Sequence, residues 1–412
     1  MANASDLPYF LLSASVRLSL KSPVFIVAKG KKTTTFVGLP ECECYQLIMD
    51  IYFPAQTTLM PQVLNHEIFM QRCLQLAASG LGRVAPNPLV GAVLVNKGKI
   101  IGEGYHQIYG GPHAEVVALQ GIDDPLLLKN STLYVNLEPC SHFGKTPPCA
   151  DLIVSKGIKE VVIANRDPFA EVNGRGIKVL KKAGVKVTTG VLEKEGAVLN
   201  KRFFSFHEKK RPYIILKWAQ SADGFLAPEK KKKNSRYATV SGEMSRTLVH
   251  QWRSEEAAIL IGSGTLKADN PLLDARMVNG SNPQKIILGT DGNIPANKNI
   301  FKQPPLPVLV YNALKAQTGS RAVYIKIPRT KNALPSILSD LHNRSVQSVL
   351  VEGGAVTLQR FIDSGLWDEA RVFTSPIEFY NGTPAPQLKK SLMQCESYIE
   401  SDRLTIYRNQ LT

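Results

Sequence analysis

The chain has 412 residues, of which 44% are hydrophobic and 20% are charged. This length predicts two or three domains, because a single hydrophobic core seldom grows beyond about 250–300 residues. The net charge of +16 is compatible with an acidic ligand, and no apolar run approaches the roughly 20 residues of a membrane-spanning helix.

Residues 1–62 carry short apolar stretches with little regular period. A secretory signal is not expected, because no basic segment precedes a sustained apolar core. An organelle transit peptide is one interpretation. A start codon assigned too far upstream is another, with Met60 or Met70 as alternative starts. We expect this extension to be disordered or a mis-assigned start, and dispensable for the rest of the chain.

From about residue 65 the pattern alternates between helix and strand. Apolar periodicity predicts helices over 66–79, 112–119, 149–156 and 176–183, and strands over 89–95, 99–102, 132–137, 161–164 and 185–188. Asn-Lys-Gly at 96–98 predicts a β-hairpin between the first two strands. The alternation predicts a three-layer α/β/α domain, which we place at residues 63–209.

A second alternating series begins near residue 211. We expect strands over 213–218, 257–262, 285–288, 307–311 and 348–351, and helices over 241–254 and 355–364. The basic segment 208–211 ends the first series, so the second α/β domain is placed at residues 210–412. The last 40 or so residues carry no motif that predicts a function.

Two short segments carry the strongest chemical signal, residues 110–115 with His113 and Glu115, and residues 138–149 with Pro139, Cys140 and Cys149. One imidazole and two thiolates are three zinc ligands, and the fourth position is left for water in a catalytic site. Each segment lies at a predicted helix start, where the helix dipole favours a thiolate. Either segment alone fits core packing or a structural metal clip, but together in this order they predict catalytic Zn²⁺.

Glu115 lies two residues after His113, a spacing that lets it face a water molecule while His113 holds the metal. Zinc lowers the pKa of such a water towards neutral, and a carboxylate can move its proton to a departing amine. A His-x-Glu followed by Pro-Cys, with the Glu not a ligand, is the arrangement of zinc nucleobase deaminases. We therefore predict Glu115 as the catalytic residue.

The sequence resembles the bacterial family of bifunctional riboflavin-biosynthesis deaminase/reductases, from about residue 65 to at least residue 365. The resemblance rests on the segment 85–93 (Ala-Pro-Asn-Pro-Leu-Val-Gly-Ala-Val) and on the long loop between the two cysteines, with Gly-Lys-Thr-Pro-Pro at 144–148. In the second half it rests on the segments at 217–224, 261–265, 269–271 and 350–354.

The resemblance implies zinc-dependent deamination of 2,5-diamino-6-(5-phosphoribosylamino)pyrimidin-4-one, followed by NADPH-dependent reduction of the ribosyl group to ribityl. It implies a cytidine-deaminase-like domain followed by a dihydrofolate-reductase-like domain. His113, Cys140 and Cys149 match the zinc ligands and Glu115 the proton shuttle. Positions that match substrate contacts of the deaminase are Asn87, His106 and Lys145. Asn87 also fits a turn former, and His106 a structural histidine.

In the second half the resemblance implies two sets of residues. Those on the cofactor side are Gln220, Tyr237, Thr265, Asp269 and Gly354. Those on the substrate side are Lys217, Ser235, Arg253, Leu273, Arg276 and Glu352. Strands that end in glycines let the backbone approach phosphates, and arginines grip a phosphate bidentately. Arg253 also fits a surface ion pair with Glu255 or Glu256.

Some positions depart from the family pattern. Ala222 stands where a Leu is common, Tyr237 where a Trp is common, and Gly289 where an Asp is usual. Asn270 replaces the second Asp of an Asp-Asp-Pro segment. Asp274 stands where a Thr is common and places an anion two residues from Arg276.

Two other functions share part of this pattern. A tRNA adenosine deaminase would share the zinc motif, and a zinc deaminase with a non-catalytic second domain would share both halves. The densest basic runs, 29–32 and 230–233, lack interleaved aromatic residues. With only six cysteines, we expect reduced thiols in the cytoplasm. We expect a phosphorylated pyrimidine as substrate, no nucleic-acid or membrane partner, and a homo-oligomer (dimer or tetramer).

Overall fold

The computed structural model describes residues 28–30, 33–35, 66–143, 147–229, 240–289, 294–305, 307–328, 330 and 333–411. The chain separates into two compact units, Met1–Glu41 and Cys42–Thr412. In the first unit, β1 (Ala28–Gly30) pairs antiparallel with β2 (Thr33–Thr35). The other residues of 1–62, for which we expected disorder or a mis-assigned start, lie outside the described residues.

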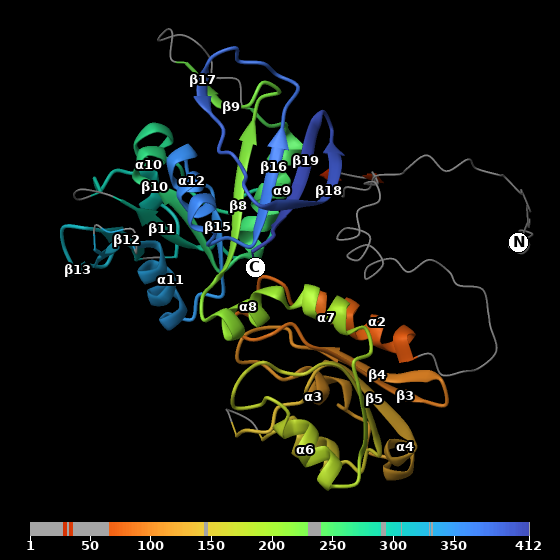
Figure 1. Ribbon diagram of the computed structural model, residues 1–412. Coiled ribbons are helices and arrows are strands. Elements are labelled where there is room, and N and C mark those ends of the chain that lie inside the picture. Colours follow the sequence, from red (N-terminus) through yellow and green to blue (C-terminus); the bar gives the residue numbers. More distant parts are fainter. Residues whose placement is uncertain are drawn as a thin grey trace, which may run out of the picture. The chain divides into compact units, whose positions relative to one another are not determined.

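The first half of the second unit is built on a five-stranded sheet with the order β4-β3-β5-β6-β7. Figure 1 labels β3, β4 and β5 of this sheet. Its strands are β3 (Gly91–Asn96), β4 (Lys99–Tyr105), β5 (Ser131–Leu137), β6 (Glu160–Asn165) and β7 (Lys186–Thr189). The predicted hairpin joins β3 to β4 through Lys97 and Gly98. Both of these residues have positive φ angles (46° and 76°), as a two-residue hairpin turn of type I′ requires.

Helices cover both faces of this sheet. Alternate residues of β3 point to opposite faces, so each face can pack against its own helices. Ala92 and Leu94 pack in one cluster with α3 and α5, whereas Val93 and Val95 pack in another with α2. The predicted three layers are therefore confirmed. The helices of this half are α2 (His66–Ala78), α3 (Ala114–Ala118), α4 (Pro125–Lys129), α5 (Cys149–Ser155), α6 (Arg175–Lys182), α7 (Glu193–Leu199) and α8 (Lys201–Lys209).

The second half is built on a ten-stranded sheet with the order β13-β14-β12-β11-β10-β15-β8-β16-β19-β18. Its strands are β8 (Tyr213–Gln220), β10 (Ala258–Gly262), β11 (Gln284–Leu288), β12 (Val308–Asn312), β13 (Gln317–Thr318), β14 (Ala322–Lys326), β15 (Ser348–Val351), β16 (Glu369–Thr374), β18 (Ser391–Ile399) and β19 (Asp402–Asn409). The strands β9 (Phe225–Pro228) and β17 (Gly382–Pro384) pair separately.

In the order of the sheet, all neighbouring strands from β14 through β12, β11, β10, β15 and β8 to β16 are parallel. Antiparallel strands lie at both edges, β13 at one and β19 with β18 at the other. Strand β15 returns between β10 and β8, so the carboxyl ends of these three strands lie side by side, where open α/β sheets bind ligands. The helices of this half are α9 (Glu243–Glu255), α10 (Ser263–Asp269), a 3-10 turn (Asn299–Phe301), α11 (Ala333–Asn343) and α12 (Ala355–Ser364).

Each predicted helix and strand has a counterpart, and the expected boundary near residue 210 falls between α8 and β8. The sequence patterns missed the helices α4, α7, α8, α10 and α11, the strands β9, β13 and β14, and all four strands after residue 365. In α8, Arg202 pairs with the buried Glu256. Lys201 lies 2.5 Å from Glu369. Among the described residues, no helix is both long and apolar enough to cross a membrane.

Candidate active sites

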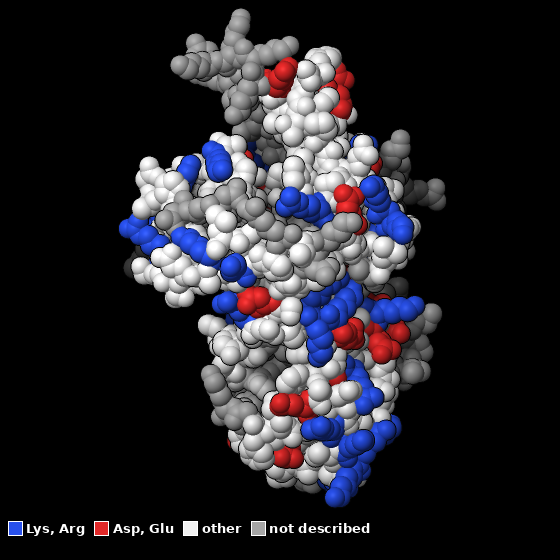
Figure 2. Space-filling view, turned by 60° about the vertical axis from the view of Figure 1, so that its left-hand side comes forward, with Lys and Arg blue, Asp and Glu red and all other residues white. Residues whose placement is uncertain are grey.

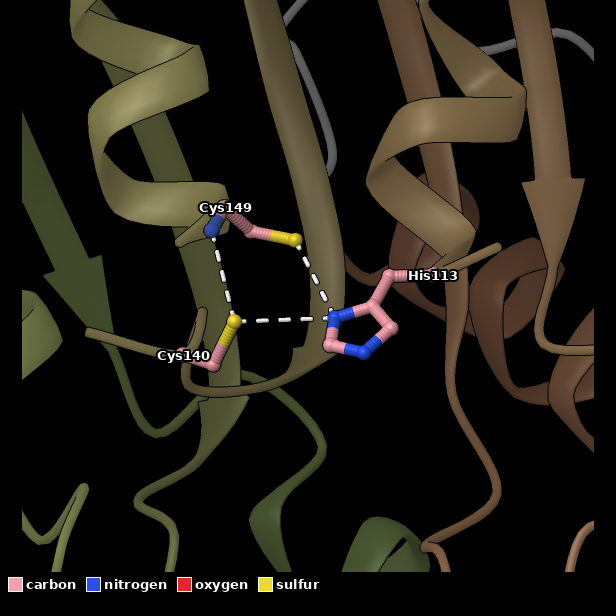
Figure 3. Close-up of side chains that lie close together, drawn as sticks. All are labelled: His113, Cys140 and Cys149. Carbon is pink, nitrogen blue, oxygen red and sulfur yellow. Dashed lines mark hydrogen bonds between the residues drawn. The ribbon is translucent and has the colours of Figure 1, made fainter. Parts of the chain in front are cut away.

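The predicted zinc ligands come together at the starts of two helices (Figure 3). His113 is the N-cap residue of α3, and Cys149 is the first residue of α5. Cys140 lies in the loop that precedes α5, and its sulfur accepts a hydrogen bond from the backbone N–H of Cys149 at 3.3 Å. Because N–H groups at a helix start are free to donate, this position stabilises a thiolate.

The distances between these side chains fit a tetrahedral zinc ion. Nδ1 of His113 lies 3.5 Å from Sγ of Cys140 and 3.3 Å from Sγ of Cys149. With Zn–S near 2.3 Å and Zn–N near 2.0–2.1 Å, nitrogen and sulfur ligands lie about 3.5 Å apart. All three ligand atoms lie within 4.8 Å of one another. The residues present therefore fit the metal.

The charge state of the thiols also suits a cation. The hydrogen bond from Cys149 lowers the pKa of Cys140 to about 4, against the opposing effect of burial. The adjacent Cys140 thiolate and burial raise the pKa of Cys149. One proton therefore stays with the pair, and a bound divalent cation would displace it, since metal ligands must be deprotonated.

Glu115 follows His113 into α3 and is only 3% exposed. Burial, and after it the negative charge of Cys140, raises the pKa of the Glu115 carboxyl. A raised pKa makes the carboxylate a stronger proton acceptor, as a group that takes a proton from water requires. The position and the proton affinity of Glu115 suit a proton shuttle.

Asn87 and His106 lie in one hydrogen-bonded chain next to the metal ligands. Nδ1 of His106 lies 2.9 Å from the carbonyl oxygen of Pro112, and its Nε2 lies 2.9 Å from the amide nitrogen of Asn87. Burial lowers the pKa of His106, so the ring is neutral. Because a carbonyl only accepts, Nδ1 carries the proton and Nε2 accepts from Asn87. This leaves the amide oxygen of Asn87 available to a ligand.

Glu138 was not singled out from the sequence, yet its carboxylate organises this site. It accepts hydrogen bonds from the backbone N–H groups of Asp167 (3.3 Å), Gly174 (2.8 Å) and Ile177 (3.1 Å). It thereby ties the Pro139-Cys140 segment to the start of α6. The only available signal was the position of Glu138 next to Pro139, and its partners lie far along the chain.

A second group of charges lies at the carboxyl ends of β8 and β15. Arg253 of α9 donates two hydrogen bonds to Glu352, each of 2.8 Å. Burial opposes ionisation of Glu352, but Arg253 lowers its pKa to about 2, and Lys217 contributes to this shift. Burial lowers the pKa of Lys217. The alternative pairing of Arg253 with Glu255 or Glu256 is wrong, because Glu352 holds its guanidinium.

Arg276 joins this group through Asp274, which lies in the same loop. The carboxylate of Asp274 accepts a hydrogen bond from Arg276, and its backbone oxygen accepts one from Arg253 at 3.1 Å. Leu273 has a φ angle of 55° and its side chain is buried in a hydrophobic cluster. Leu273 can therefore contact a substrate only through its backbone.

The expected cofactor residues lie around the starts of α10 and α12. The backbone N–H of Gly354 donates to the hydroxyl oxygen of Thr265 at 2.9 Å, which joins the two turns. A Cβ atom at Gly262 would lie 2.4 Å from Oγ1 of Thr357, so only glycine permits this approach. Two helix starts held this closely form a cradle that fits the phosphates of a dinucleotide.

The remaining predicted residues are placed as follows. Gln220 ends β8 and accepts a hydrogen bond from Trp218 at 2.8 Å, and Asp269 is the last residue of α10. The loop that carries Lys145 and the segment that carries Ser235 and Tyr237 lie outside the described residues.

Two family models match the chain. The model described as "Cytidine and deoxycytidylate deaminase zinc-binding region" matches residues 64–165. The model described as "RibD C-terminal domain" matches residues 212–395. The zinc ligands lie within the first match, and the charge group around Glu352 lies within the second.

Curated relatives match across both halves. "Riboflavin biosynthesis protein RibD" of Bacillus amyloliquefaciens is 40% identical over 330 residues, which cover 78% of this chain and 87% of the relative. The protein of the same name from Escherichia coli (strain K12) is 33% identical over 329 residues, covering 76% and 88%.

Solved structures agree with this relationship. A diaminohydroxyphosphoribosylaminopyrimidine deaminase/5-amino-6-(5-phosphoribosylamino)uracil reductase from Thermotoga maritima has a TM-score of 0.74 and 36% identity, covering 84% of this chain and 98% of that one. Acinetobacter baumannii RibD has a TM-score of 0.73 and 29% identity, covering 84% and 99%.

Proposed function

This chain belongs to the RibD family of riboflavin biosynthesis proteins, and from that premise we propose that the residues described above form a deaminase site and a reductase site. The protein is a bifunctional deaminase and reductase that uses zinc and NADPH. The second half is that of a RibD reductase, which a tRNA deaminase would not explain. Figure 2 shows acidic side chains among the lysines and arginines of the face drawn, so the positive charge on that face is interspersed with negative charge.

We assign the deamination to the group around Glu115. His113, Cys140 and Cys149 would hold zinc, which when bound lowers the pKa of a water molecule towards neutral. Glu115 would take a proton from that water and deliver it to the amino group that leaves. The free amide oxygen of Asn87, fixed by His106, would accept a hydrogen bond from the pyrimidine edge. Lys145 would bind the phosphate.

We assign the reduction of the ribosyl group to the ends of β8, β10 and β15. NADPH supplies the hydride, and Thr265, Asp269, Gln220 and Gly354 would orient it, with Tyr237. The residues that would bind the opened sugar and its phosphate are Lys217, Ser235, Arg253, Leu273, Arg276 and Glu352. The substrate is the deaminated phosphoribosylaminouracil.

The observation that carries this proposal is the buried Glu115, which interacts with three side chains whose spacing fits zinc. A coupled assay tests it, in which ammonia release and NADPH oxidation are followed on the diaminopyrimidine substrate. We expect ammonia first and NADPH oxidation second. Ammonia without NADPH oxidation would leave the second half non-catalytic, and no ammonia from zinc-loaded protein would refute the substrate.

We also propose that residues 63–209 and 210–412 are the two functional domains, and that the enzyme acts in the cytoplasm as a dimer or tetramer. The low number of cysteines suits a reducing compartment. Light scattering on the purified full chain tests the oligomeric state.

A further inference from the structure

Asp274 lies between the two arginines that we assign to the substrate phosphate. Its carboxylate accepts a hydrogen bond from Arg276, and its backbone oxygen accepts one from Arg253. The Asp274 side chain is 5% exposed, whereas that of Arg276 is 57% exposed. A phosphate would therefore reach Arg276 from the solvent side while Asp274 holds it from the protein side.

The backbone on both sides of Asp274 is fixed. The N–H group of Ala275 donates to the side-chain oxygen of Asn282 at 2.8 Å. Leu273, with its positive φ angle, is anchored in a hydrophobic cluster. Because neighbours on both sides are held, the inward direction of the Asp274 carboxylate is part of the fold, and does not arise from a mobile surface side chain.

The charges around this point cancel only in part. The cations Lys217, Arg253 and Arg276 lie near the anions Glu352 and Asp274, and the buried Lys285 is also attracted to Asp274. His250, next to them on α9, adds no charge near neutral pH, because burial and then Arg253 lower its pKa to about 4. Two net positive charges then remain for a phosphate that carries close to two negative charges. Replacing Asp274 with a neutral residue would raise this net charge to three, and would free Arg276 from its carboxylate partner.

We propose that Asp274 is a specificity-determining residue of the reductase site, which neutralises Arg276 and so weakens the grip on the phosphate of the sugar chain. This inference rests on the proposed reductase function. Since substrate and product carry the same phosphate, a weaker grip favours release of the product as much as it opposes binding of the substrate.

The test compares Asp274→Asn with the wild-type full chain, loaded with zinc and given NADPH and the deaminated phosphoribosylaminouracil. Removing a competing charged hydrogen bond should lower the KM by about tenfold without raising kcat. The same substrate without its phosphate should show no change in KM. In an Arg276→Gln background, Asp274→Asn should have no effect, because the competing pair is already broken. Asp363→Asn, which breaks an exposed pair with Lys389, is the matched control.

A binding measurement separates this inference from the proposed function. Calorimetry with ribose 5-phosphate should show about tenfold tighter binding to Asp274→Asn, even if the wild-type protein oxidises no NADPH. An unchanged or higher KM together with unchanged binding would refute the role of Asp274, and would leave the reductase assignment intact. An equal gain for the substrate without phosphate would also refute it. If Asp274→Asn fails to fold, Asp274→Thr tests the same points, with ammonia release as the check of folding.

Discussion

The two candidate sites differ in how their charged groups are satisfied. At the zinc site, His113, Cys140 and Cys149 converge on one point with a spacing that fits a metal ion. At the reductase site, arginines are already paired with carboxylates of the same chain, Arg253 with Glu352 and Arg276 with Asp274. The first site is built to be filled by a cation. In the second, a ligand must compete with groups that already have partners.

The largest expected effect is at the metal. Cys149→Ala removes a thiolate from a three-ligand site, so we expect loss of bound zinc and of ammonia release. Metal analysis and the deaminase assay measure both. NADPH oxidation on the deaminated substrate should persist, and its loss would show that the metal also supports the second half.

Glu115→Gln separates proton transfer from metal binding. Zinc content should stay at the wild-type level, while deamination should fall by about 10²–10⁴-fold because the proton shuttle is lost. Kinetics at saturating substrate, with zinc measured on the same sample, check this result. If the variant lost its zinc, Glu115 would instead be a residue that helps to hold the metal.

Glu352→Gln tests the reductase site, where the arginines are paired with carboxylates of the same chain. Its carboxylate is the partner of both Arg253 and Lys217, so removing the charge leaves buried cations uncompensated. We expect the kcat/KM for NADPH oxidation to fall by about 10- to 100-fold, with deamination unchanged. The matched comparison is Asp274→Asn, where we expect the opposite sign. The same sign in both variants would refute the distinction between the two anions.

The smallest expected effect concerns pH and His207, whose ring packs against Phe203 at 4.4 Å and Phe169 at 5.1 Å. Burial lowers its pKa to about 4, from about 6.5 in an unfolded chain. Because the fold favours the neutral ring, its contribution is full above about pH 6.5 and is lost as the pH falls towards 4.

The free energy of unfolding of the wild type, measured with urea, should therefore fall between pH 7 and pH 5. His207→Phe should show a smaller fall over the same range. Equal pH dependence of the two proteins would show that His207 does not contribute.

The sequence was sufficient to find the zinc site because its residues lie in two short segments, each at a helix start. Local periodicity likewise located β3 with α2, α3 and α5, and it located β8, but not α8 and α11, which also pack near β8. The sequence already placed Asp274 two residues from Arg276, whereas the pairing of Arg253 with Glu352 was not predictable, since Glu352 is 99 residues from Arg253. The strands β18 and β19 were not predicted, because no motif drew attention to this part of the chain. Strand β19 joins the sheet by pairing with β16, and β18 joins it by pairing with β19.

Glu138 connects the segment that carries Cys140 to the start of α6, which follows 36 residues later in the chain. Its carboxylate joins the Cys140 segment to three backbone N–H groups at and before the start of α6. Withdrawing the metal would release one end of this connection. The amide protons of Gly174 and Ile177 should then exchange with solvent faster in chelated protein, so that hydrogen exchange at α6 reports metal loss without any substrate.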